Sequence, residues 1–153
     1  MRAVVQRVKR TSVTVGGELK GSAGQGFNVL IGVMQGDTDA EAQLLAAKIS
    51  KLRVFEDENG KMNKSVLDIG GEILVISQFT LCADIKKGNR PSFTDSAPPE
   101  EVDRLYLAFC EHLREAGVKK VETGVFAADM LVSIDNDGPV TIVMDTDIWE
   151  KRG

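Results

Sequence analysis

Two apolar runs limit the folds that this chain can adopt. They are FNVLIGVM at residues 27–34 and ILVISQF at residues 73–79, and glycines precede both. Short apolar runs bounded by turn residues are typical of strands that are buried on both faces. The longer run is far below the ~20 residues that a membrane helix needs. The sequence therefore predicts a soluble, non-membrane protein with at least two central strands.

Two further segments have the pattern of helices. Thr38 and Glu41 have the spacing of a capping box, and Leu45, Ile49 and Leu52 would lie on one face of the helix that follows. A second helix is expected to begin near residue 96 and to end at Gly117. Its first turn would contain a proline and two glutamates, which suit the positive end of the helix dipole.

The remaining strand signals are short. Residues 12–15 alternate between apolar and polar side chains, and Gly16-Gly17 suits a hairpin turn. Two final strands are expected at residues 130–134 and 140–144, joined by a DNDGP turn. Strands outnumber helices and do not alternate regularly with them. This predicts an α+β fold: a β-rich single domain of two packed sheets or a partly closed barrel, with two flanking helices.

One domain accounts for the whole chain. A length of 153 residues lies close to the ~100–150 typical of a single domain. We expect the domain to cover residues 1–145 and residues 146–153 to form a frayed C-terminal tail.

The charge and the cysteine content of the chain limit the nucleic acids and metals that it can bind. The net charge of −4 argues against indiscriminate binding of nucleic acid, although a local basic patch stays possible. Two cysteines and one histidine are too few for a structural zinc site, so we expect no metal and no cofactor. The N-terminal residues carry several charges and no signal-peptide core, so we expect a reducing, cytoplasmic location.

The catalytic inventory is small. His112 is the only histidine and lies within the second predicted helix, where a structural role is the simpler interpretation. A Ser-His-Asp triad is therefore not expected. Two clusters remain, SQFTLCAD at residues 77–84 and NDGPVT at residues 136–141, and from spacing alone the simpler interpretations are an ordinary strand end and an ordinary turn. The segment from Lys86 to Arg90 is a basic stretch in a long polar loop, and a solvated loop is its alternative.

Taken together, these motifs are identifiable. SQFTLCAD, GNRPSF at 88–93, FAADM at 126–130 and NDGPVT resemble, in this order, the D-aminoacyl-tRNA deacylase family, also called D-tyrosyl-tRNA deacylase. GKMN at residues 60–63 matches as well, and the resemblance spans residues 1 to about 145. Cys82 stands where many members have alanine, and nothing carries over to Trp149.

The resemblance implies a homodimer that hydrolyses the ester between a D-amino acid and the 3′ end of tRNA. It places Ser77, Gln78, Phe79 and Thr80 in the catalytic pocket, with Thr80 at the position of a threonine once assigned as nucleophile. Gly138 and Pro139 match a Gly-cisPro motif that enters the partner's pocket and excludes L-amino acids. We also expect substrate contacts from Ala128 and Met130, and tRNA contacts from Lys86 and Arg90.

Two mechanisms stay open at this point. An aminoacyl ester is already activated, so backbone amides at Phe79 and Thr80 could supply much of the stabilisation. Either Thr80 attacks the ester, or the ribose 2′-hydroxyl assists a water; we favour the second, because the sequence shows no base near Thr80. The alternative functions are an ester or thioester hydrolase with a non-RNA substrate and a non-catalytic RNA-binding protein.

Overall fold

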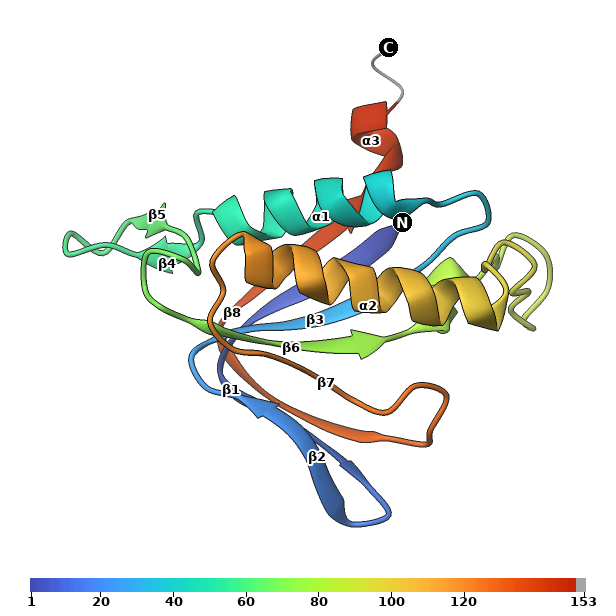
Figure 1. The fold of residues 1–153 in the computed structure, drawn as a ribbon, viewed down its shortest axis with the longest axis horizontal. Coiled ribbons are helices and arrows are strands. Elements are labelled where there is room, and N and C mark those ends of the chain that lie inside the picture. The colour runs from blue at the N-terminus through green and yellow to red at the C-terminus, as the bar shows by residue number, and fades with distance from the viewer. Residues whose placement is uncertain (151–153) are drawn as a thin grey trace.

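The computed structural model describes residues 1–150, and its architecture is α+β (Figure 1). A mixed sheet holds six strands in the order β2-β1-β3-β6-β7, with β8 on the remaining edge of β1. Its strands are β1 (Arg2–Val15), β2 (Glu18–Ala23), β3 (Gly26–Gly32), β6 (Glu72–Ser77), β7 (Val121–Thr123) and β8 (Leu131–Asp145). A separate hairpin pairs β4 (Phe55–Glu56) with β5 (Met62–Lys64). The helices are α1 (Asp39–Lys51), α2 (Pro99–Glu115), the short α3 (Asp147–Glu150) and the 3-10 helix η1 (Phe79–Cys82).

The six-stranded sheet is curled into a nearly closed barrel. One edge of β1 pairs with β3 through residues 2–8 and with β2 through residues 11–15. This brings β2 close to β7 at the far end of the strand order, where the Ser22 amide donates to the Glu122 carboxylate at 2.8 Å. The partly closed barrel is therefore the predicted alternative that is confirmed.

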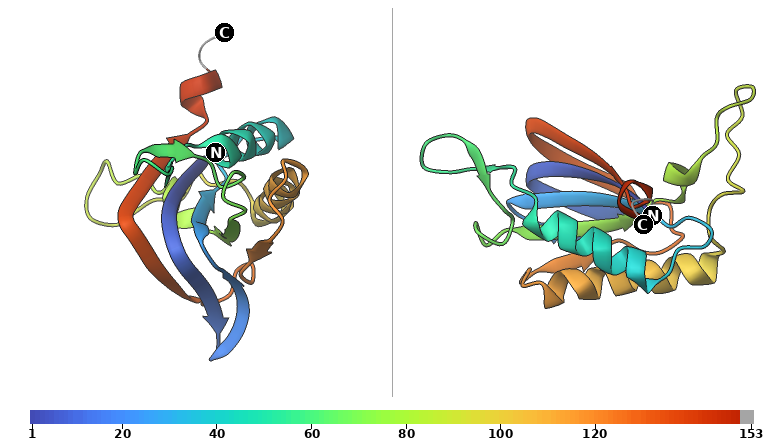
Figure 2. Two further views of the ribbon diagram at one scale, coloured as in Figure 1. Left: turned by 90° about the vertical axis from the view of Figure 1, so that its left-hand side faces the viewer. Right: turned by 90° about the horizontal axis from the view of Figure 1, so that it is seen from above.

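The central strands are buried on both faces, as the apolar runs predicted. Phe27 and Val29 of β3 pack in the core beneath the helices, whereas Leu30 faces a second cluster inside the curl. In β6, Val75 packs in the core beneath the helices and Leu74 belongs to the second cluster. Figures 1 and 2 show α1 and α2 side by side over one face of the sheet.

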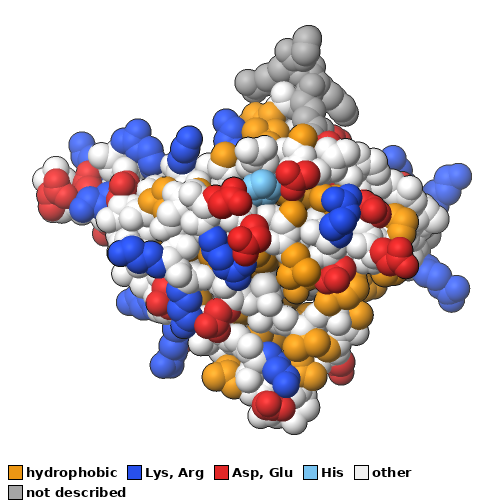
Figure 3. Space-filling view, viewed as in Figure 1, with side chains coloured by type: hydrophobic (Ala, Val, Ile, Leu, Met, Phe, Trp, Pro, Cys, Tyr) orange, Lys and Arg blue, Asp and Glu red, His pale blue; other side chains and the backbone are white. Residues whose placement is uncertain are grey.

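The predicted helix signals are confirmed. Thr38 is the N-cap of α1, and the Glu41 carboxylate accepts the Thr38 amide at 3.0 Å, which completes the capping box. α2 begins at Pro99 with two glutamates in its first turn. His112 lies on α2, and its Nε2 is 2.8 Å from the Asp39 carboxylate at the start of α1. In Figure 3 this histidine lies among acidic side chains on the helix face.

Two expectations about the C-terminal part were wrong. The predicted strands at 130–134 and 140–144 form one strand, β8, because both halves pair with β1. The DNDGP segment is a bulge in this strand, since the register jumps from Thr141 opposite Gln6 to Asn136 opposite Val8.

The tail is also more ordered than expected. Thr146 is buried, and its hydroxyl accepts the Met1 amino group at 2.9 Å. Trp149 of α3 packs against the core, with the Lys48 ammonium 5.3 Å from its ring centre. Residues 146–150 are therefore part of the folded structure. Residues 151–153, to which the frayed tail was also assigned, lie outside the described residues.

Candidate active site

A pocket of about 940 Å³ opens where β6 ends. Ser77 is the last residue of β6, and the Gln78 amide still donates to the Ile31 carbonyl of β3 at 2.8 Å. The chain then turns into η1, and Phe79 stands half exposed at the mouth. The turn at residues 126–130 and the start of α2 also line the pocket. In Figure 3, apolar side chains gather below α2 on this side of the molecule.

Five predicted site residues line this pocket together: Ser77, Gln78, Phe79, Ala128 and Met130. They come from two segments about fifty positions apart in the sequence, which the curled sheet brings together.

Thr80 adjoins the pocket. It is exposed, in the first turn of η1, and its hydroxyl accepts a hydrogen bond from the side-chain amide of Gln78. A carboxamide cannot take a proton from a threonine, so this contact orients the hydroxyl without making it a better nucleophile.

The other predicted residues lie elsewhere. Gly138 and Pro139 are exposed in the β8 bulge, do not line the pocket of their own chain, and are joined by a cis peptide bond. Arg7 holds this bulge from beneath: its Nε donates to the Asp137 carbonyl at 3.1 Å and its Nη1 to the Val54 carbonyl at 2.6 Å.

Lys86 and Arg90 are exposed in the loop between η1 and α2. An antiparallel bridge from Asp84 to Ser92 closes the base of this loop. Figure 2 shows that the loop projects from the body of the molecule, on the side opposite α1 and α2.

Sequence reasoning missed several lining residues. Phe126 and Phe93 belong to motifs that had been recognised, yet no role was given to either. Phe93 makes an edge contact with Phe79, with ring centres 5.0 Å apart. Gln35 had no signal, because it follows β3 and reaches the pocket only through the fold. Ala127 has a φ of 63°, a left-handed backbone that is rare outside glycine and forms the sharp turn of this wall.

The pocket lining contains no ionisable side chain. Its polar groups are the hydroxyls of Ser77, Thr94 and Ser96, the amides of Gln35 and Gln78, and the backbone. Cys82 is the last residue of η1, and burial raises the pKa of its thiol, so this group is neutral. The part of the chain that the structure describes holds no group of three or more acidic, histidine or cysteine side chains that could bind a metal. The pocket can therefore bind and orient through hydrogen bonds and dipoles.

Fold and site together define a class: a small α+β domain with a nearly closed sheet and an uncharged pocket at a strand end. The family model for D-Tyr-tRNA(Tyr) deacylase matches residues 4–145. A D-aminoacyl-tRNA deacylase of Thermus aquaticus is 56% identical over 153 residues, covering 100% of this chain and 99% of the relative. One of Thermomicrobium roseum is 57% identical, with 100% and 97% covered. This chain belongs to the D-Tyr-tRNA(Tyr) deacylase family.

Two solved structures have a similar fold. A c-Myc DNA unwinding element binding protein is 48% identical with a TM-score of 0.90, covering 95% of this chain and 98% of that chain. A probable eukaryotic D-amino acid tRNA deacylase is 18% identical with a TM-score of 0.80, covering 94% and 97%. At this identity the second likeness supports the fold alone. Among the described residues, no helix has the length and apolar character needed to cross a membrane.

Proposed function

We propose that this protein is a D-aminoacyl-tRNA deacylase, a hydrolase that releases a free D-amino acid and tRNA. Its family membership supports the assignment, and the observation that carries the mechanism is the pocket at the end of β6, which has no ionisable lining residue. Such a pocket suits an activated ester, because the substrate needs positioning and charge stabilisation rather than a full catalytic triad. The deacylase domain is proposed to span residues 1–145, and the described residues 146–150 pack against it.

The backbone at the start of η1 is the proposed oxyanion site. The first hydrogen bond of this helix joins the Leu81 amide to the Gln78 carbonyl at 3.2 Å. The amides of Phe79 and Thr80 precede it, and the first amides of a helix have no acceptor within the helix. Removing a donor of this kind typically costs about 3–4 kcal/mol of transition-state stabilisation.

The attacking group is a water assisted by the ribose 2′-hydroxyl that neighbours the ester. Thr80 positions the substrate, because the contact of its hydroxyl with Gln78 provides no base. Direct attack by Thr80 is the rival mechanism. The two differ in the effect of removing the hydroxyl, which the Discussion uses as a test.

The functional form is a homodimer in which Gly138 and Pro139 enter the partner's pocket. These residues do not line the pocket of their own chain and lie on β8, the strand that pairs with the edge of β1 opposite β2 and β3. The same strand exposes Leu131 and Val143, 70% and 77% accessible, and such apolar side chains suit an interface.

Chirality is enforced by exclusion. Backbone carbonyls at Gly138 and Pro139 block the direction of an L side chain and leave the D direction open, so no tailored side-chain pocket is needed. Glycine has no side chain to block, so glycyl-tRNA is also a substrate.

Contact with tRNA is limited to its 3′ end, held by the exposed Lys86 and Arg90 of the projecting loop. A few phosphate contacts are compatible with a chain of net charge −4, and binding then depends weakly on salt. The enzyme acts in the cytoplasm, where aminoacyl-tRNA is used.

The test compares D-Tyr-tRNA, L-Tyr-tRNA, Gly-tRNA and D-tyrosine ethyl ester under identical conditions. We expect rapid hydrolysis of the first, measurable hydrolysis of Gly-tRNA and little of the other two. Ethyl-ester hydrolysis with inert tRNA substrates would favour the non-RNA hydrolase, and inactivity on all four would leave a binding protein. If Gly-tRNA is as inert as L-Tyr-tRNA, exclusion is wrong and a side-chain site must exist.

A further inference from the structure

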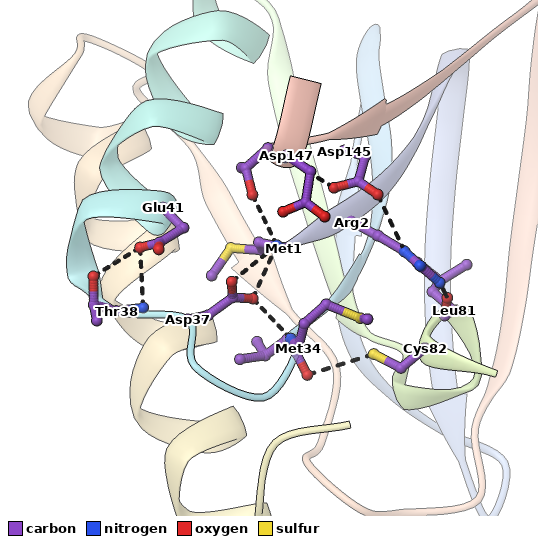
Figure 4. A network of polar contacts seen from close by, with 12 residues as sticks. Met1, Arg2, Met34, Asp37, Thr38, Glu41, Leu81, Cys82, Asp145 and Asp147 are labelled. Carbon is purple, nitrogen blue, oxygen red and sulfur yellow. Dashed lines mark hydrogen bonds and ion pairs between the residues drawn. The ribbon is translucent and has the colours of Figure 1, made fainter. Parts of the chain in front are cut away.

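The C-terminal end of helix η1 is held by a side chain from the N-terminal strand of the chain. The Nη1 of Arg2, in β1, donates to the carbonyl of Leu81 at 3.0 Å. Figure 4 shows the Arg2 side chain extending from the sheet to this carbonyl. The last carbonyls of a helix have no intrahelical partner, so a charged donor at this position is a capping interaction.

Asp145 orients the guanidinium of Arg2. The two residues are direct cross-strand partners of β1 and β8, and the Arg2 Nε is 3.3 Å from the Asp145 Oδ2. The other oxygen of this carboxylate accepts the Asp147 amide at 3.0 Å. The carboxylate therefore uses one oxygen to start α3 and the other to hold Arg2 against η1 (Figure 4).

η1 also rests on β3, next to Arg2, because Arg2 and Gly32 are cross-strand partners of β1 and β3. A Cβ added at Gly32 would lie 2.9 Å from the Leu81 Cβ and 3.2 Å from the Gln78 carbonyl, so η1 contacts the strand as closely as glycine permits. The Cys82 thiol also donates to the Val33 carbonyl at 3.4 Å. β3 therefore supports η1 by close packing, and Arg2 of the neighbouring strand restrains it through the Leu81 carbonyl.

We propose that Arg2, oriented by Asp145, is a positioning residue for the deacylation reaction. Its side-chain hydrogen-bond partners, Leu81 and Asp145, do not line the pocket, and it acts by fixing η1, which carries Phe79 and the two amides of the oxyanion site. The inference rests on the proposed function for its catalytic consequence. A small displacement of a positioned group suffices to slow a reaction strongly.

The protein contains its own control. Arg10 and Asp135 are also cross-strand partners of β1 and β8, with Nε and Oδ2 2.6 Å apart. This pair lies where β1 approaches β2, at the other end of the strand from η1. Arg2→Met and Arg10→Met therefore remove the same ion pair chemistry from the same two strands, and only the first releases η1.

The experiment measures single-turnover and steady-state kinetics on D-Tyr-tRNA for wild type, Arg2→Met, Arg2→Lys and Arg10→Met, with melting temperatures for all four. We expect Arg2→Met to lower kcat about tenfold with KM within about twofold, as for a group that acts in the transition state. Arg2→Lys keeps a positively charged donor but loses the forked guanidinium, so its kcat should lie between those of Arg2→Met and wild type. Arg10→Met should stay within about twofold of wild type in both constants.

Amide hydrogen exchange tests the same idea without activity. We expect the amides of residues 81–83 to exchange faster in Arg2→Met and to be unchanged in Arg10→Met. Equal kcat and exchange in wild type and Arg2→Met would overturn the inference, as would equal losses in both methionine variants. An inactive wild type would instead refute the proposed function, and the exchange data would then decide the positioning role alone.

Discussion

The segments at residues 77–82 and 137–140 are both rigidly held, yet they differ in what they face. The first ends a buried strand, is supported by β3 and Arg2, and lines a pocket in its own chain. The second is held just as firmly, by Arg7, but presents Gly138 and Pro139 to the outside. Gly138 and Pro139 do not line the pocket of their own chain, and this is understandable if a second copy supplies their contact. Under the proposed function, the first segment forms a site within one chain, whereas the second segment acts only in a dimer.

The largest effect on kcat is expected from disturbing the packing of η1, in the first segment, against β3. Gly32→Ala places a Cβ 2.9 Å from the Leu81 Cβ and should displace η1. We expect kcat on D-Tyr-tRNA to fall by about 100-fold, because the oxyanion amides move with the helix. Gly24→Ala is the control, since its Cβ meets only the flexible side chain of Glu72. A Gly32→Ala enzyme with the kcat of wild type would show that the position of η1 does not depend on its close packing against Gly32.

The second segment should depend on dimerisation. Leu131→Asp with Val143→Asp places two charges on the exposed face of β8 and should yield a monomer by sedimentation. We expect the preference for D-Tyr-tRNA over L-Tyr-tRNA to fall about 30-fold, equivalent to about 2 kcal/mol, because no partner then blocks the L direction. Leu107→Asp, on the exposed face of α2, is the control and should stay dimeric. A monomer that still prefers D-Tyr-tRNA would show that chiral selection does not need the second chain.

Arg7 tests how firmly the second segment is held. Arg7→Met leaves the Val54 and Asp137 carbonyls without their charged donor, and Arg7 itself is buried. We expect the free energy of unfolding to fall by about 2 kcal/mol, as for a lost hydrogen bond to a charged group. Urea denaturation measures this, with Arg10→Met as the exposed comparison. Equal stability of the two variants would mean that the bulge does not depend on Arg7.

The Thr80 hydroxyl should matter least. Thr80→Ala removes the partner of the Gln78 amide but leaves the backbone of η1 in place. We expect single-turnover rates within about tenfold of wild type, because the amides and the 2′-hydroxyl remain. A loss of about four decades, equivalent to about 5–6 kcal/mol, would restore Thr80 as the nucleophile.

The sequence alone predicted the local features of the fold. The capping box at Thr38, the Gly16-Gly17 hairpin and the doubly buried strands each depend on neighbouring residues, and all are confirmed. The residues of the pocket wall at Ser77 and Met130 were named because their motifs are specific. These features follow from backbone propensity and from hydrophobic periodicity, which operate over a few residues.

Long-range pairing decided the rest. Whether residues 130–144 form two strands or one depends on β1, which pairs with both halves and turns DNDGP into a bulge. The order of the tail depends on Lys48 and on the Met1 amino group, which are distant in sequence. Arg2 could be linked to Leu81 only after β1 and β8 had set its direction. A sequence determines which segments prefer to be strands or helices, but contacts between distant residues exist only once the sheet has curled and brought them together.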